Sequence, residues 1–196
     1  IRDRCIIISG FIRTHKRKGY FKMSDLKKYI TDIPDFPRKG IIFHDVTSLL
    51  QDSEGFHKSI DQLLKKLDGV EFDAVAGLDA RGFLFGAPVA YAKNKGFIPV
   101  RKKGKLPRET VSAEYELEYG TAVIEMHTDA LKKGDRVVII DDLMATGGTL
   151  EAAVRLCEQL GAEVVKILCL IELKGLNGRD KLKGYDVESL ISYDEK

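Results

Sequence analysis

Long hydrophobic runs, paired cysteines and two common nucleotide-binding motifs are missing from this chain of 196 residues. No apolar run approaches the roughly 20 residues that span a bilayer, so we expect no membrane segment. The three cysteines show no Cys-x-x-Cys or zinc-type spacing, which favours buried thiols in a reducing cytoplasm. Neither Gly-x-x-x-x-Gly-Lys-Ser/Thr nor Gly-x-Gly-x-x-Gly occurs, which excludes a Walker A loop and a dinucleotide fingerprint.

The composition favours a globular protein with one domain. Hydrophobic residues make up 44% and charged residues 32% of the chain, as in soluble proteins of this size. The formal net charge of +2 is unevenly distributed, because residues 1–22 hold seven Lys/Arg and one Asp. The remaining residues hold 25 Lys/Arg against 29 Asp/Glu, and this slightly acidic body argues against broad nucleic-acid binding.

Residues 1–22 are interpreted as a basic leader or extension, and residues 23–196 as a single domain that begins at Met23. The main basic cluster, residues 15–18, follows an apolar stretch, whereas a signal peptide has the opposite order. Three origins therefore stay open: translated upstream or cloning-derived sequence, an organelle transit segment, or a genuine extension.

After Met23, helical and strand patterns alternate. We expect helices at 24–30, 55–68, 81–94 and 149–160, and strands at 72–79, 96–102, 123–131, 134–142, 162–173 and 186–193. Residues 33–40 are expected to form a loop, and residues 103–120 a long mobile loop with a short strand. This alternation predicts an α/β fold with a doubly wound parallel sheet flanked by helices.

The most informative stretch is residues 137–149, VVIIDDLMATGGT. An apolar run typical of a buried parallel strand ends in Asp141 and Asp142. The small residues Ala145–Thr149 follow and lead into a helical pattern, so backbone N–H groups and a helix start can bind a phosphate. The two carboxylates suit sugar hydroxyls, Mg²⁺ or a developing cation. An ordinary strand–turn–helix junction has no need of them, so the stretch predicts a phosphorylated ribose as ligand.

Residues 137–149 resemble the phosphoribosyl-pyrophosphate (PRPP) motif of type I phosphoribosyltransferases. Together with residues 36–50, 76–88 and 100–120, they make residues 25–193 similar to the adenine phosphoribosyltransferase family. The resemblance implies transfer of the 5-phosphoribosyl group from PRPP to adenine, giving AMP and pyrophosphate in purine salvage. It also implies Mg²⁺ as cofactor, a cytoplasmic homodimer, a small N-terminal hood and a mobile catalytic loop.

The same resemblance assigns the residues that bind PRPP and those that neutralise its pyrophosphate group. PRPP and AMP would be bound by Asp79, Ala80, Asp141, Asp142, Ala145, Thr146, Gly147, Gly148 and Thr149. Arg81, Arg101 and Lys105 would neutralise pyrophosphate, with Arg101 reaching across the dimer interface. Taken alone, the basic residues 101–105 also fit a solvated loop or a nucleic-acid patch. No metal ligand is assigned, because Mg²⁺ would be held mainly by PRPP and water.

The base would be activated and recognised by two further segments. Glu118, next to Tyr119 on the mobile loop, is the candidate for proton exchange with adenine; Glu114 and Glu116 are its rivals, and a plain surface glutamate is the alternative. Adenine would contact Ile42, His44 and Leu143. Since many relatives carry Arg in place of His44, this histidine fits a hydrogen-bonded surface role equally well.

Other whole-protein interpretations fit the sequence less well. A phosphoribosyltransferase for another base, such as xanthine, conflicts with the stretches at 40–43 and 117–120. A PRPP-sensing transcription regulator would need a DNA-reading module, and about 30 residues before the core are too few for a winged helix. A non-catalytic interaction domain has no particular feature in its favour.

Overall fold

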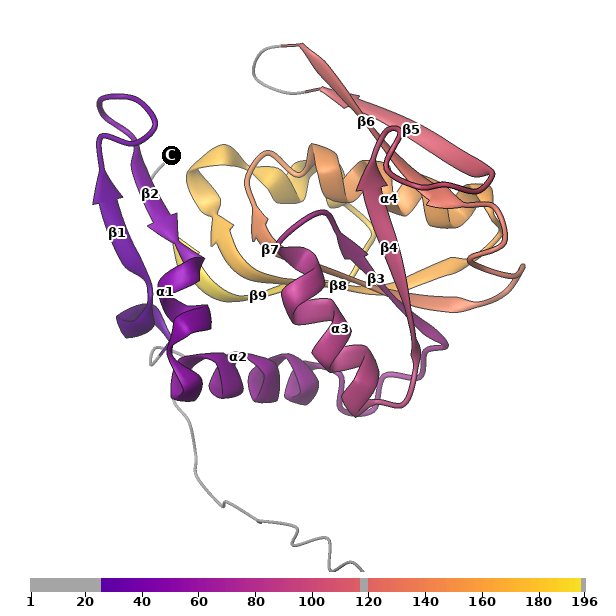
Figure 1. Ribbon diagram of the computed structural model, residues 1–196, viewed down its shortest axis with the longest axis horizontal. Helices are drawn as coiled ribbons and strands as arrows, with labels where there is room; N and C mark the ends of the chain where they lie inside the picture. Colours follow the sequence, from indigo (N-terminus) through magenta and orange to yellow (C-terminus); the bar gives the residue numbers. More distant parts are fainter. Residues whose placement is uncertain (1–25, 117–119, 195–196) are drawn as a thin grey trace, which may run out of the picture.

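The computed structural model describes residues 26–116 and 120–194. At its centre lies a seven-stranded sheet with the order β5-β6-β4-β3-β7-β8-β9 (Figure 1). The strands are β3 (Ala74–Leu78), β4 (Gly96–Lys102), β5 (Thr110–Glu116), β6 (Thr121–His127), β7 (Arg136–Met144), β8 (Glu163–Leu173) and β9 (Val187–Tyr193). The five strands from β4 to β9 in this order run parallel, whereas β6 is antiparallel to both β4 and β5. The predicted α/β class is therefore confirmed.

Helices cover both faces of the sheet, as the side-chain alternation along β7 shows. Val137 and Ile139 pack in the core that includes α4 (Gly148–Gln159). Val138 and Ile140 pack in the opposite core, with α1 (Val46–Gln51), α2 (Ser53–Lys66) and α3 (Gly82–Ala92). Because all four β7 side chains are fully buried, the apolar run has no solvent-exposed face. The doubly wound arrangement predicted from the alternation of elements is confirmed.

The helices differ from prediction mainly at their ends. The helix expected from residue 55 begins at Ser53, because the Asp52 side chain caps it by accepting from the Gly55 N–H at 2.8 Å. The helix expected at 24–30 is only a 3₁₀ turn, Lys27–Tyr29, in the described residues. α1 was not predicted; Asp45 caps it by accepting from the Thr47 N–H at 2.9 Å.

A two-stranded hairpin stands apart from the main sheet and forms the predicted hood (Figure 1). β1 (Thr31–Pro34) pairs antiparallel with β2 (Ile42–Asp45), so the loop expected at 33–40 begins with the end of a strand. Pro34 is tolerated because a two-stranded ribbon has only edge strands.

A second projection, here called the arm, consists of β5 and β6 (Figure 1). The short strand expected within residues 103–120 is present as residues 110–116, which pair with β6 along their whole length. Ala113 is buried, whereas its neighbours Ser112 and Glu114 are exposed, so the strand has one buried side and one polar side. The polar side gives this stretch a composition that resembles a loop. The arm packs on α4.

Close packing between β3 and α3 depends on glycine. A Cβ added at Gly77 or Gly86 would come within 2.6 Å or 2.9 Å of the Phe97 ring, so the ring from β4 lies on both glycines. The small residues at the start of the 81–94 pattern predicted such packing.

Elsewhere in the core, burial raises the pKa of the Cys157 thiol to about 12 and the pKa of the Cys169 thiol well above its usual value. Both cysteines are free. In the described part of the chain, no helix has the length and hydropathy to cross a membrane.

Candidate active site

The segment between β7 and α4, here called the phosphate loop (Ala145–Thr149), has the backbone geometry of an anion site. Gly147 caps α4 with φ of 80°, in the left-handed region that favours glycine. A cavity of about 160 Å³ lies along the loop and is lined by residues 143–150. The first N–H groups of α4 lack partners within the helix, and the helix dipole adds partial positive charge there. The cavity can therefore take a phosphate without a cationic side chain.

The two carboxylates at the end of β7 are nearly inaccessible, with Asp141 at 9% and Asp142 at 7% exposure. The Asp142 N–H donates to Asp141 Oδ1 at 2.8 Å, and Asp142 Oδ2 pairs with Arg81 Nε. Burial, and next the neighbouring Asp142 charge, raise the pKa of Asp141 well above its usual value. A ligand that donates hydrogen bonds or carries positive charge relieves this unfavourable burial.

A second strand–loop–helix junction lies directly beside the first, because β3 pairs with β7. β3 ends at Leu78, and Asp79, Ala80 and Arg81 lead into α3; the Asp79–Ala80 peptide is cis. The ion pair between Arg81 and Asp142 joins the two junctions. The sequence-predicted residues at both strand ends are thus brought to one edge of the sheet.

The basic residues at the end of β4 and directly after it lie beside the second junction. Arg101 Nε donates to Asp79 Oδ2 at 3.1 Å, and its Nη1 donates to the Lys105 carbonyl at 3.2 Å. The turn between them is held by Glu125, whose carboxylate accepts from the Gly104 N–H at 2.9 Å. Arg101 and Lys105 therefore share the sheet edge that carries Arg81, and the reach of Arg101 into a partner's site stays a prediction.

The residues expected to contact adenine have different surroundings. Ile42 is exposed at the start of β2, and Leu143 is partly buried against the core below α1–α3. His44 is buried; its Nδ1 lies 2.6 Å from Asp32 Oδ1, and its ring stacks on Tyr193 at 3.5 Å. Since Tyr193 ends β9, His44 attaches the hood to the sheet. The sequence also allowed a surface position for His44, and this alternative is wrong because the side chain is buried. Contact of His44 with adenine stays a prediction.

Comparisons with known proteins agree with this geometry. Residues 46–194 match the model of the phosphoribosyl transferase domain. The adenine phosphoribosyltransferase of Lachnoclostridium phytofermentans is 63% identical over 171 residues, which cover 87% of this chain and 98% of that protein. The chain belongs to the adenine phosphoribosyltransferase family.

Solved structures of adenine phosphoribosyltransferases share the fold. The crystal structure of the Thermoanaerobacter pseudethanolicus enzyme has a TM-score of 0.85 and 55% identity, and covers 88% of this chain and 100% of that chain. The Saccharomyces cerevisiae enzyme, complexed with an imino-altritol bisphosphate and adenine, has a TM-score of 0.81 and 41% identity. That comparison covers 86% of this chain and 97% of the yeast chain.

The residue predicted to exchange a proton with adenine and its neighbour Tyr119 follow β5 in the sequence. Glu118 and Tyr119 lie outside the described residues. Their rivals Glu114 and Glu116 are exposed on β5 and line a cavity of about 510 Å³ between the arm and α4. This cavity shares no lining residue with the phosphate-loop cavity, so their place favours neither rival as the proton donor.

Two glycines shape the adenine phosphoribosyltransferase site, and sequence reasoning missed the second of them, Gly178. A Cβ at Gly82 would lie 2.8 Å from the Ile140 carbonyl and 2.9 Å from Asp141 Oδ1, so glycine allows α3 to start against the acid pair. A Cβ at Gly178 would overlap the Ala145 carbonyl of the phosphate loop. Gly178 begins the 3₁₀ turn η4 (Gly178–Leu182). Its only signal in the sequence is a glycine between polar residues, which is common in surface turns.

Proposed function

We propose that this protein transfers the 5-phosphoribosyl group of PRPP to a ring nitrogen of adenine, giving AMP and pyrophosphate. The observation that carries the proposal is the buried acid pair, which directly precedes a phosphate loop and faces the cations of the neighbouring junction. One ligand can then bind through its phosphate, its diol and its leaving group at a single edge of the sheet.

The reaction breaks the bond between carbon 1 of the ribose and pyrophosphate and forms a bond from carbon 1 to the base. Carbon 1 becomes positively charged at the transition state, as in glycoside cleavage. The phosphate loop holds the 5′-phosphate away from the reacting carbon. Asp141 and Asp142 accept hydrogen bonds from the ribose hydroxyls, and their negative field stabilises the developing cation.

The departing pyrophosphate needs positive charge, which Arg81, Arg101 and Lys105 provide. Arg81 and Arg101 are 46% and 34% exposed, and each already pairs with one carboxylate. Since these pairs are partly solvated, pyrophosphate can compete for the guanidinium groups at modest cost. When Arg81 turns to the pyrophosphate, Asp142 becomes available to the ribose.

Mg²⁺ fits the donor chemistry of this edge, because hard cations prefer carboxylate, phosphate and water oxygens. The described residues contain no cluster of three or more His, Cys, Asp or Glu side chains that could hold a metal on their own. We therefore assign its main ligands to PRPP and water, and a bound Mg²⁺ would add charge to neutralise pyrophosphate. Glu118, in the mobile loop expected at residues 103–120, is proposed to exchange a proton with the adenine ring.

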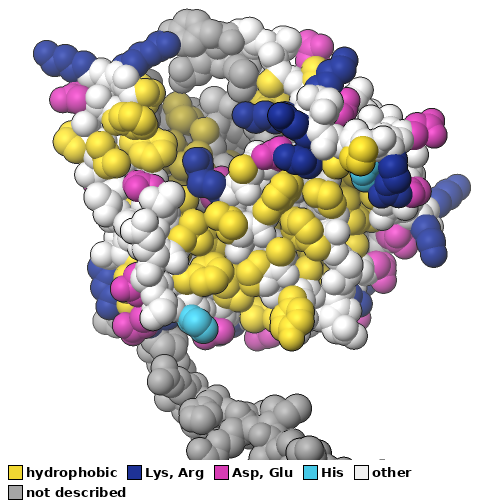
Figure 2. All heavy atoms as spheres, viewed as in Figure 1, with side chains coloured by type: hydrophobic (Ala, Val, Ile, Leu, Met, Phe, Trp, Pro, Cys, Tyr) yellow, Lys and Arg dark blue, Asp and Glu magenta, His cyan; other side chains and the backbone are white. Residues whose placement is uncertain are grey.

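We further infer a homodimer that acts in the cytoplasm. α3 exposes Leu84 at 45% and Tyr91 at 89%, and Figure 2 shows hydrophobic side chains gathered over this part of the surface. Apolar side chains gathered on a surface are typical of protein contacts. Sedimentation analysis tests the dimer: a monomer at micromolar concentration would contradict it.

The inference that the protein acts in the cytoplasm has a separate basis. The two buried free thiols support a reducing compartment.

The proposed reaction is tested by measuring pyrophosphate release from PRPP and Mg²⁺ with adenine, hypoxanthine, guanine, xanthine or orotate in parallel. We expect turnover with adenine to exceed that with each other base by at least about 10³-fold, because a site that pairs with one purine edge leaves polar groups unpaired with another. Turnover with hypoxanthine or xanthine but not adenine would contradict the assignment of the base.

A further inference from the structure

The 3₁₀ turn η4 lies against the phosphate loop, although the contacting glycines, Gly147 and Gly178, are 31 positions apart in the sequence. Gly147 and Gly178 pack backbone to backbone: a Cβ on Gly147 would overlap the Gly178 carbonyl, and one on Gly178 would lie 3.1 Å from the Gly147 nitrogen. β8 extends alongside β7 so that Glu172 is paired in register with Met144, and η4 follows closely. The end of β8 therefore brings η4 to the phosphate loop.

An ion pair anchors η4 in this place. Arg179 donates through Nε and Nη2 to the two carboxylate oxygens of Glu172, at 2.6 Å and 2.7 Å. Ser189 Oγ donates to the same carboxylate at 2.7 Å, and Arg179 Nη1 donates to the Val187 carbonyl at 2.8 Å. Glu172 is buried, and the Arg179 hydrogen bonds lower its pKa below the usual value. A two-pronged pair of this kind fixes both position and direction.

The three basic residues of this segment have different surroundings. Arg179 is held by Glu172, and Lys183 pairs with Asp180 at 3.1 Å on the surface. Lys181 instead lines the cavity between the arm and α4. Its Nζ lies 3.7 Å from the position of a Cβ on Gly148, the first residue of α4. The ammonium group is thus next to Gly148 on the side that faces β5, where the Glu116 carbonyl is a second neighbour, and it is within reach of the phosphate loop.

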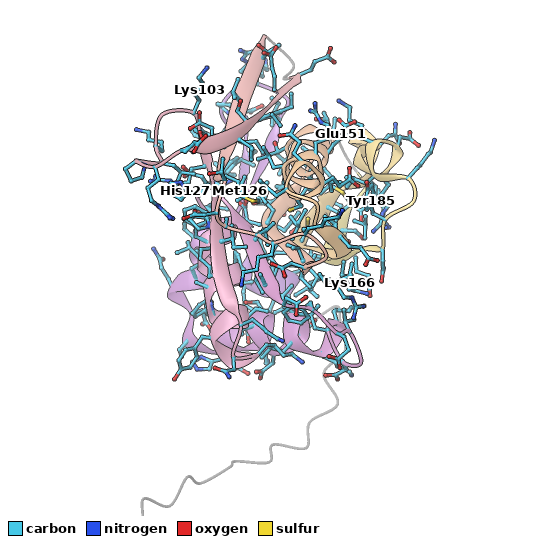
Figure 3. All side chains as sticks on the ribbon, turned by 90° about the vertical axis from the view of Figure 1, so that its right-hand side faces the viewer. Lys103, Met126, His127, Glu151, Lys166 and Tyr185 are labelled. Carbon is cyan, nitrogen blue, oxygen red and sulfur yellow. The ribbon has the colours of Figure 1, made fainter. Side chains whose placement is uncertain are left out.

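This cavity is not an anion site by itself. Its lining includes Glu114, Glu116 and Glu151 as well as Arg155 and Lys181, so acids outnumber bases. Arg155 already donates to the Glu114 carbonyl at 2.5 Å. Glu151 lies in the first turn of α4, and Figure 3 shows it beside the segment that carries η4. The cavity lining therefore does not predict a bound anion, and it is the short distance from Lys181 to Gly148 that relates this side chain to the phosphate loop.

We infer that Lys181 is a further substrate-binding residue, whose ammonium group binds the phosphate of the ligand in the phosphate loop and is held there by the Glu172–Arg179 anchor. The inference rests on the proposed function, because that function places a phosphate in the loop. The loop, residues 145–149, supplies backbone N–H groups but no cationic side chain, so Lys181 would add a full positive charge beside it. A dianionic phosphate gains most from such a charge.

The test compares Lys181→Met and Lys181→Arg with the matched control Lys183→Met. We expect Lys181→Met to raise the KM for PRPP about tenfold, as loss of one charge-assisted contact implies, with the KM for adenine unchanged within about twofold. Lys181→Arg should recover most of the affinity, and Lys183→Met should match the wild type. The thermal midpoint of all three variants should stay within about 2 °C of the wild type.

Direct binding of ribose 5-phosphate, measured by calorimetry, separates this inference from the proposed function. Weaker binding by Lys181→Met but not Lys183→Met supports the inference even if no purine is converted to a nucleotide. Equal ribose 5-phosphate affinity in Lys181→Met and wild type would overturn it, even if adenine turnover is confirmed. An equal rise in the KM for both substrates would also overturn it, since that pattern indicates a general structural change.

Discussion

Two neighbouring strand–loop–helix junctions, β7 to α4 and β3 to α3, have the same topology but offer opposite kinds of anion site. After β7, the loop presents backbone N–H groups shaped by Gly147, and its charged side chains are buried acids. After β3, the loop presents Arg81, a partly exposed cation that is already paired with Asp142. The first junction therefore provides a rigid backbone site for an anion, and the second provides a cation that can change partners.

The difference corresponds to what each anion does during the proposed reaction. The 5′-phosphate remains attached to the sugar throughout, so a rigid backbone site can hold it without reorganisation. Pyrophosphate must bind and leave, and side chains with alternative partners such as Asp79 and Asp142 can release it. The comparison predicts that changes at the first junction affect binding and stability together, whereas changes at the second affect mainly turnover.

The largest expected effect comes from neutralising both acids of the first junction. Asp141→Asn with Asp142→Asn should lower kcat/KM for PRPP by at least about 10³-fold, because the ribose hydroxyls lose their acceptors and the cationic transition state loses its field. Steady-state AMP synthesis measures this. The control is Asp73→Asn, because Asp73 lies at the opposite end of β3 and its carboxylate accepts from the Arg136 N–H at 2.8 Å. Unchanged synthesis in the double variant would refute the role of the acid pair.

Gly147→Ala should have the next largest effect. Its φ of 80° strains any L side chain, and the new Cβ would overlap the Gly178 carbonyl. We expect unfolding to become easier by about 2–3 kcal/mol and the KM for PRPP to rise about 30-fold. Gly134→Ala is the matched control, since Gly134 has φ of 90° but open space around its Cβ position. If both variants bind PRPP equally well, contact with η4 has no part in shaping the loop.

Arg81→Met tests the exchangeable charge of the second junction. We expect kcat to fall about tenfold to 100-fold while the KM for adenine stays unchanged, because the guanidinium acts on the leaving group. In the reverse direction, the KM for pyrophosphate should rise. Arg108→Met, which removes an exposed cation paired with Asp129, serves as the control. A rise in the KM for adenine alone would place Arg81 at the base instead.

The smallest effect is a gain in stability at the acid pair. Burial raises the pKa of Asp141, so its neutral form is favoured in the folded state. The neutral Asp141 carboxyl therefore contributes to stability at pH values below its pKa in the unfolded chain, which is about 4. This contribution is lost as the pH rises through the higher pKa of Asp141 in the folded protein. Asp141→Asn should therefore raise the Tm by about 2–4 °C near neutral pH and change it little at pH about 4. An equal change at both pH values would contradict this.

The sequence predicted the parts of the fold where burial is uniform. β3, β7 and β8 are apolar runs whose side chains are buried on both faces, and such runs are conspicuous in a sequence. β1 was missed, and β5 was expected only as a short strand without bounds inside a long loop, because edge strands with Pro34 or alternating glutamates give a weaker signal. α1 was missed because six residues are too few to show a helical period.

The site could be predicted where chemistry lies in consecutive residues and not where the fold assembles it. The acids and small residues of 141–149 stand together in the sequence, so their association needed no structure. Arg81 with Asp142 and Gly147 with Gly178 are pairs from separate elements. Their contacts follow from the register of β3, β7 and β8, which no local pattern encodes.

The inaccessible thiols of Cys157 and Cys169 make the folded chain well suited to site-specific labelling. Thiol reagents attack the thiolate, which burial keeps scarce at both positions near neutral pH. With Cys5 changed to serine, a single cysteine introduced at the exposed Glu114 would be the intended point of attachment for a spin label or fluorophore. Distances from such a probe to a second one on the hood would then follow how the molecule responds as each substrate arrives.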